Sequence, residues 1–234
     1  MKKFMVYVCL TIFALFTFQG TYTKANTDSD LNKLVELGIV KENEKQRIKN
    51  VNEPIKKMDA YILYIRLAGL ESKAKSFRGK NTYKDISQIP KEYVPYVNYA
   101  KANPKLGWDK KSETFQPRAT LTIKEFTKYM LDLLGYTPDR DYLAEEQMEF
   151  AQSIYLLSKQ EVERANSKLT IKDAHAIILK AMKVFNKQGQ LFSAVLENKK
   201  IVNGDVVKKY NLHISSEETN AETKEIDMEV EEVK

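Results

Sequence analysis

The sequence of 234 residues predicts a mainly α-helical protein. Apolar residues recur at intervals of three and four in three separate stretches, which is the spacing of one helix face. The stretches are NEPIKKMDAYILYIRLAGL (52–70), ATLTIKEFTKYMLDLLGY (119–136) and NSKLTIKDAHAIILKAMKV (166–184). The strict alternation of apolar and polar residues that marks a half-buried strand is weak throughout the chain. We therefore expect helices and little or no sheet.

The three stretches align on one apolar residue each, and an acidic residue follows four positions later. The apolar positions are Ile55, Leu121 and Leu169, and the acidic positions are Asp59, Glu125 and Asp173. Gly69 and Gly135 both stand 14 positions after the apolar residue, where a glycine commonly ends a helix. The third stretch has Lys183 at this position, so its helix is expected to run further.

Two of the three helix starts carry a capping signal. Thr122 precedes Glu125 by three positions, and Thr170 precedes Asp173 by three. At this spacing each side chain bonds an amide that the first turn of a helix leaves unsatisfied. Lys56 replaces the threonine in the first stretch, so we expect no cap there.

A second amphipathic pattern precedes each of these helices. The patterns are DLNKLVELGIV (30–40), PKEYVPYVNYAKAN (90–103) and EEQMEFAQSIYLLSKQ (145–160). Each pair forms a helix-loop-helix unit, and the predicted boundaries are 26–80, 81–138 and 139–214. One such pair cannot bury its apolar stripe alone, so the three units are expected to share one core.

The N-terminal residues resemble a secretory signal peptide. Lys2 and Lys3 precede an apolar run from Phe4 to Phe18, and small residues precede a cleavage point after Ala25. The alternative is a retained anchor, although this run is shorter than the ~20 residues that span a bilayer. Cys9 is the single cysteine, so a chain cleaved after residue 25 has no disulfide, no thiolate metal ligand and no cysteine nucleophile.

The charge is divided unevenly along the chain. Residues 215–234 hold eight acidic and two basic residues and no aromatic residue, so we expect a disordered acidic tail. Residues 26–214 hold 33 basic and 24 acidic groups, a net charge of +9. A basic core suggests an anionic partner, or it serves solubility alone. For an exported protein this favours wall polymers or a membrane surface, and no nucleic acid is expected.

The middle unit resembles an S-layer homology (SLH) domain over about 54 residues. The resemblance rests on Tyr83-Lys84-Asp85, Leu106-Gly107-Trp108, Phe115-Gln116-Pro117 and the helix start Thr122-Ile123-Lys124-Glu125. The first and third units match by their second helices and register. The resemblance implies three diverged SLH-like repeats in a pseudo-threefold helical assembly. It also implies a secreted protein that binds anionic secondary cell-wall polysaccharide at the surface of a Gram-positive-type bacterium.

The sequence departs from the family at one ligand contact. The resemblance implies an arginine at the second position of the helix-start motif, where it meets the negative charge of the ligand. Ile123 and Ile171 occupy this position in the second and third units, and Lys57 occupies it in the first. Lysine supplies a point charge, whereas arginine supplies a planar pair of donors.

Four residues are therefore predicted to bind polysaccharide: Lys57, Trp108, Arg118 and Lys124. Trp108 either stacks on a sugar ring or seals its loop onto the helices. Arg118 either reaches a carboxylate on the polymer or caps a neighbouring acid. Lys124 stands one position from the motif arginine, on a different helix face.

No catalytic residue, metal site or cofactor is predicted, and we do not expect an enzyme. A wall glycosidase would use a pair of carboxylates. Glu145 and Glu149 share a predicted helix face, but clustered glutamates on an amphipathic helix usually form its solvated side. His175 and His213 lack metal-ligand spacing. The alternative function is a helical protein-interaction scaffold at the cell surface that has lost polysaccharide binding and holds another surface protein.

Overall fold

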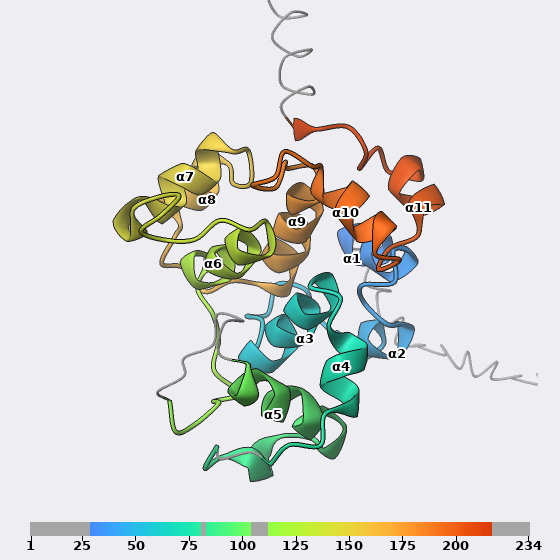
Figure 1. Cartoon of the computed structure of the whole chain (residues 1–234), viewed down its shortest axis with the longest axis vertical. Helices are drawn as coiled ribbons and strands as arrows, with labels where there is room; N and C mark the ends of the chain where they lie inside the picture. Colours follow the sequence, from blue (N-terminus) through green and yellow to red (C-terminus); the bar gives the residue numbers. More distant parts are fainter. Residues whose placement is uncertain (1–28, 81–82, 104–111, 217–234) are drawn as a thin grey trace, which may run out of the picture.

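A computed structural model describes residues 29–80, 83–103 and 112–216 (Figure 1). These ranges contain eleven α-helices and three short 3₁₀ helices, and their only β-pairing is a few isolated bridges. The predicted mainly α-helical class is confirmed. The predicted signal peptide, Trp108 and the acidic tail from residue 217 lie outside the described residues.

The helices occur in the following order along the chain. They are α1 (Ser29–Glu36), α2 (Glu42–Lys45), α3 (Lys57–Leu67), α4 (Glu71–Ser76), η1 (Ile86–Gln88), η2 (Lys91–Tyr93), α5 (Val94–Ala102), α6 (Ile123–Leu133), η3 (Ala144–Glu146), α7 (Gln147–Ser153), α8 (Lys159–Glu163), α9 (Ile171–Ala181), α10 (Phe192–Asn198) and α11 (Gly204–Lys209).

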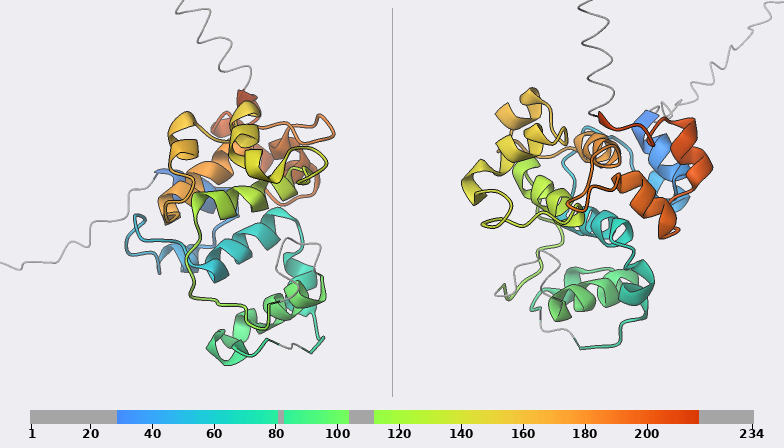
Figure 2. Two further views of the ribbon diagram at one scale, coloured as in Figure 1. Left: turned by 90° about the vertical axis from the view of Figure 1, so that its left-hand side faces the viewer. Right: turned by 45° about the horizontal axis from the view of Figure 1, so that its top comes forward.

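Helices α3, α6 and α9 form the centre of the molecule (Figures 1 and 2). Each has 11 residues, and each begins two positions after one of the aligned apolar residues. These three residues, Ile55, Leu121 and Leu169, are all buried. Their shared burial explains why the apolar pattern repeats in the sequence.

The backbone segments that lead into these helices bond to one another in a recurring pattern. The amide of Ile55 donates to the carbonyl of Leu169 at 2.9 Å, and the amide of Leu169 donates to the carbonyl of Leu121 at 2.8 Å. The residues two positions after the aligned apolar residues also donate their backbone amides to another segment. The amide of Lys57 donates to the carbonyl of Ala119 at 2.7 Å, that of Ile123 to Ser167 at 3.2 Å, and that of Ile171 to Glu53 at 2.9 Å. Isolated bridges join Lys56 to Thr120, Thr122 to Lys168 and Pro54 to Thr170. Each segment therefore pairs with both of the others. We call this arrangement the three-segment junction.

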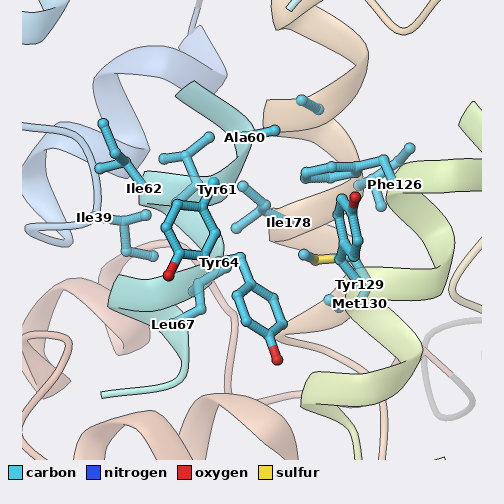
Figure 3. Close-up of a cluster of buried hydrophobic side chains, with 14 of the residues drawn as sticks. Ile39, Ala60, Tyr61, Ile62, Tyr64, Leu67, Phe126, Tyr129, Met130 and Ile178 are labelled. Carbon is cyan, nitrogen blue, oxygen red and sulfur yellow. The ribbon is translucent and has the colours of Figure 1, made fainter. Parts of the chain in front are cut away.

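The outer helices pack against the central ones. Helix α7 packs on α6, and α1 packs on α9. The Tyr61 hydroxyl on α3 donates to the Tyr96 carbonyl on α5 at 2.9 Å. Figure 3 shows the core between α3, α6 and α9, where the rings of Tyr64 and Tyr129 lie 5.9 Å apart.

Three helix ends differ from the sequence prediction. The predicted helix over 145–160 ends at Ser153, because Tyr155 takes a left-handed conformation (φ 61°). The predicted helix over 30–40 likewise ends at Glu36, and Gly38 takes a left-handed conformation just after it (φ 83°). Helix α9 does not run further than α3 or α6. It ends at Ala181, and the amide of Ser193 then bonds the Met182 carbonyl at 3.0 Å, which turns the chain away.

The C-terminal helices lie against the N-terminal helix. Helices α10 and α11 flank α1 in Figure 2, and Lys209 on α11 bonds Glu36 on α1 at 2.6 Å. The connection between α10 and α11 contains Lys200, which takes a left-handed conformation (φ 57°). Helix α11 therefore contacts α1 although the two lie at opposite ends of the described chain.

The junction leads to a first prediction. Leu169→Ala should reduce the free energy of unfolding by about 2–5 kcal/mol, because it leaves a cavity among fully buried side chains. Leu143→Ala is the matched control, because 52% of Leu143 is exposed. Denaturant unfolding measures both variants, and an equal, small loss would contradict the role given to the junction.

Candidate binding cavity

A cavity of about 480 Å³ opens beside α3, along the face from Met58 to Arg66. Its walls come from α3, from the segment 40–54, from the segments 88–93 and 117–118, and from the start of α9. Residues from all three predicted units therefore line it. The volume falls within the ~300–1,000 Å³ range of small-molecule sites.

The floor of the cavity is apolar. It is formed by Ile55, Met58, Ile62, Leu63 and Ile171. Ile55 belongs to the three-segment junction, so the junction fixes the floor in place.

Four cations surround the opening: Arg47, Lys49, Lys56 and Arg118. Arg47 donates from Nη2 to the Tyr93 hydroxyl at 3.2 Å, which joins the 40–54 segment to the second unit. This hydrogen bond raises the pKa of Arg47, whose side chain is charged at neutral pH in any case. Exposed cations above an apolar floor give the cavity the means to hold an anion that has an apolar face.

A largely buried ion pair lines the cavity. Arg66 donates to both carboxylate oxygens of Glu44, at 2.6 and 2.7 Å, and its Nε donates to Glu71 at 3.0 Å. Burial opposes the charge on Glu44 and on Arg66. Their hydrogen bonds and attraction outweigh that penalty, so the pKa of Glu44 lies below its ordinary value and the pKa of Arg66 lies above it. The pair is a fixed wall of the cavity, and its charges are already satisfied.

Asp59 is an exposed residue that lines the same cavity. It forms no hydrogen bond or ion pair with the rest of the described chain, although solvent reaches it. Displacement of water by the surrounding walls raises the pKa of Asp59, and nearby Lys56 and Arg47 partly offset this rise. The cavity therefore offers a hydrogen-bond acceptor beside its cations.

The structure separates the residues predicted to bind polysaccharide. Arg118 lines the cavity. Lys57 lies outside it, with Nζ 5.2 Å from the centre of the Phe115 ring. Lys124 lies at the start of α6, where its amide donates to Ala165 and its carbonyl accepts from Gln147. Trp108 is outside the described residues.

The two isoleucines at the motif position differ in their surroundings. Ile123 is completely buried, so it packs in the core and does not face a ligand. Ile171 is partly exposed and forms part of the cavity floor. His175 also borders the cavity, and 2% of it is exposed.

Sequence reasoning missed Arg47, Lys49, Tyr93 and Asp59 as cavity residues. Arg47, Lys49 and Tyr93 are brought together by the tertiary positions of the segments 40–54 and 88–93, which no local sequence pattern predicts. Asp59 did carry a signal, because Lys56 stands where the other two units have a capping threonine. A cap acid without a cap partner is available for another contact.

The rest of the described chain contains a second hollow and no cluster of metal-ligating side chains. No group of three metal-ligating side chains occurs within its ranges. A second hollow lies beside Tyr155, and its cations are Lys159, Lys180 and Lys183. Lys180 bonds Glu161 at 2.5 Å, so one of these charges is already paired.

Comparisons with known proteins leave the site to be interpreted from its own chemistry. No protein-family model matches the chain, and a search of curated proteins found no match. Within the described ranges, no helix has both the length and the apolar character needed to cross a membrane.

The ion pair predicts a pH dependence. Glu44→Gln should reduce the free energy of unfolding at pH 7 by about 1–3 kcal/mol, because it leaves buried donors of Arg66 poorly satisfied. The folded-state pKa of Glu44 is lowered, so the stability that this carboxylate adds is present at neutral pH. This stability decreases once the pH falls below the pKa of a glutamate in the unfolded chain, about 4.3. It is lost as the pH falls further, through the lower pKa of Glu44 in the folded protein.

Denaturant unfolding at pH 7 and pH 3 tests this dependence. The difference between the wild type and Glu44→Gln should shrink at pH 3. Glu42→Gln on the same helix is the control, because Glu42 makes only an exposed contact with Lys45 at 3.6 Å. A difference that is unchanged by pH would contradict the assignment.

Proposed function

We propose that this protein is an exported, non-catalytic cell-surface module that binds an anionic cell-wall polysaccharide. The observation that carries the proposal is the cavity beside α3, which brings Arg118 together with Arg47 and Lys49 above an apolar floor. The proposal includes no cofactor and no nucleic acid partner. It places the protein in the wall of a Gram-positive-type bacterium.

The chemistry of the cavity suits an acidic sugar. Sugar rings present apolar C–H faces, which pack on surfaces such as Met58 and Ile62. The guanidinium groups of Arg47 and Arg118 match the planar geometry of a carboxylate. Tyr93 adds an aromatic side chain at the same opening.

The backbone geometry supports the proposal that the three units are diverged SLH-like repeats. The pairing between the segments that lead into α3, α6 and α9 recurs at equivalent positions in all three. Each central helix has the same length and starts at the same position relative to its buried apolar residue. On this proposal, the assembly is pseudo-threefold and the cavity lies where the repeats meet.

A binding experiment with purified Gram-positive walls tests the function. Arg118→Ala should weaken binding about two- to fivefold and flatten its salt dependence, because an exposed ion pair is worth ~0.2–1 kcal/mol and is screened by salt. Arg140→Ala is the matched control, because Arg140 is exposed and does not line the cavity.

Lys57→Ala distinguishes two possible binding sites, the cavity and the motif position that the family resemblance favours. Lys57 lies over Phe115 and outside the cavity, so its loss should weaken binding less than the loss of Arg118 does. Absence of wall binding at every salt concentration would refute the proposed function. A larger effect from Lys57→Ala would move the site away from this cavity.

The apolar floor favours one alternative, a scaffold that holds another surface protein. Ile171 makes part of the cavity apolar where the family resemblance implies an arginine. Co-purification of a protein partner from a wall-free extract, with no polysaccharide binding, would support the scaffold instead.

A further inference from the structure

The three central helices start from the same backbone conformation but have different caps. The N-cap residues Lys56, Thr122 and Thr170 have φ between −81° and −88° and ψ between 148° and 165°. Thr122 and Thr170 each accept a hydrogen bond from the amide three residues later, whereas the Lys56 side chain makes no capping bond. The backbone is therefore ready for a cap at all three positions.

The acidic residue of the cap accepts capping hydrogen bonds in α6 and α9 but not in α3. The Glu125 carboxylate accepts from the Thr122 amide at 2.7 Å, and the Asp173 carboxylate accepts from the Thr170 hydroxyl at 2.7 Å. Asp59 has no such bond. Its carboxylate borders the cavity instead.

The groups around Asp59 make it a suitable contact for hydroxyls. The charged residues that share its part of the cavity are Lys56, Arg47 and Glu44. Glu44 is already bound to Arg66, so it does not compete for a ligand. A carboxylate that receives no hydrogen bond within the described chain can accept them from ligand groups that donate. Sugar hydroxyls are such donors, and they carry no charge that Lys56 and Arg47 would repel.

We propose that Asp59 contacts the ligand directly, by accepting hydrogen bonds from sugar hydroxyls while Arg47 and Arg118 hold the anionic group of the polymer. This inference rests on the proposed function and adds a specificity-determining residue to its site. Replacement of the capping threonine by Lys56 is what leaves the carboxylate available. Helix α3 therefore lacks a side-chain cap, and the cavity contains a hydrogen-bond acceptor.

Restoring the cap gives a direct test. Lys56→Thr should recruit Asp59 into a capping box, so it should raise the melting temperature about 2–4 °C above that of Lys56→Ala. It should also weaken binding to purified Gram-positive wall polysaccharide about tenfold relative to Lys56→Ala. The two variants remove the same lysine charge, and only the threonine can engage the carboxylate.

A second variant tests the carboxylate itself. Asp59→Asn should weaken binding about three- to tenfold, because a neutral amide is a poorer acceptor than a carboxylate. Partial O-acetylation of the same polysaccharide blocks hydroxyls and keeps the anionic groups. The wild type should lose affinity for the acetylated polymer, and Asp59→Asn should lose less.

The outcomes separate this inference from the proposed function. If the wild type binds the polymer and Arg118→Ala binds more weakly, but Lys56→Thr matches Lys56→Ala and Asp59→Asn matches the wild type, only the role of Asp59 is overturned. If the wild type does not bind the polymer, both proposals fail. A gain in stability from Lys56→Thr without any loss of binding would also overturn the inference.

Discussion

The three-segment junction is the constraint on which the rest of the structure depends. Segments around Ile55, Leu121 and Leu169 are far apart in the sequence, yet each pairs its backbone with the other two. These pairings satisfy polar groups that would otherwise be buried without partners beside fully enclosed side chains. They also fix where each central helix begins. The helix starts, and every side chain in the first turns, are thereby placed relative to one another.

The cavity follows from this placement and from one irregularity. Glu44 and Glu161 both accept a hydrogen bond from the N-cap amide of a short outer helix, and both bond a cation on a central helix. Eleven positions separate Glu44 from Ile55, whereas eight separate Glu161 from Leu169. The longer connection contains Arg47 and Lys49, which form the basic side of the cavity. A regular core and one extended loop together produce an asymmetric site.

Much of the fold was predictable because its signals are local. The spacing of apolar residues located the central helices, and the Thr122–Glu125 and Thr170–Asp173 pairs located two caps, which the structure contains. The break at Tyr155 was missed because a left-handed tyrosine gives no signal of the kind that glycine gives. The end of α9 was missed because a tertiary contact, the amide of Ser193 on the Met182 carbonyl, turns the chain there.

The site was less predictable than the fold. Arg118 was identified from its place beside Pro117, and it lines the cavity. Lys57 was favoured by alignment to a family motif, but its ammonium group lies over Phe115 because the first turn of α3 faces the second unit there. The contribution of Tyr93 depends on its hydrogen bond with Arg47, 46 positions away in the chain. Alignment gives a position along a helix, whereas membership of a cavity depends on what the other units bring to it.

Amide hydrogen exchange, with and without purified wall polysaccharide, tests the link between the junction and the cavity most directly. The amides of Ile55 and Leu169 should exchange slowly in the free protein, because they bond across units inside the core. Polysaccharide should then add protection within residues 47–59, most of which line the cavity, and leave residues 144–164 unchanged. Rapid exchange at Ile55 and Leu169, or new protection confined to 144–164, would contradict this account.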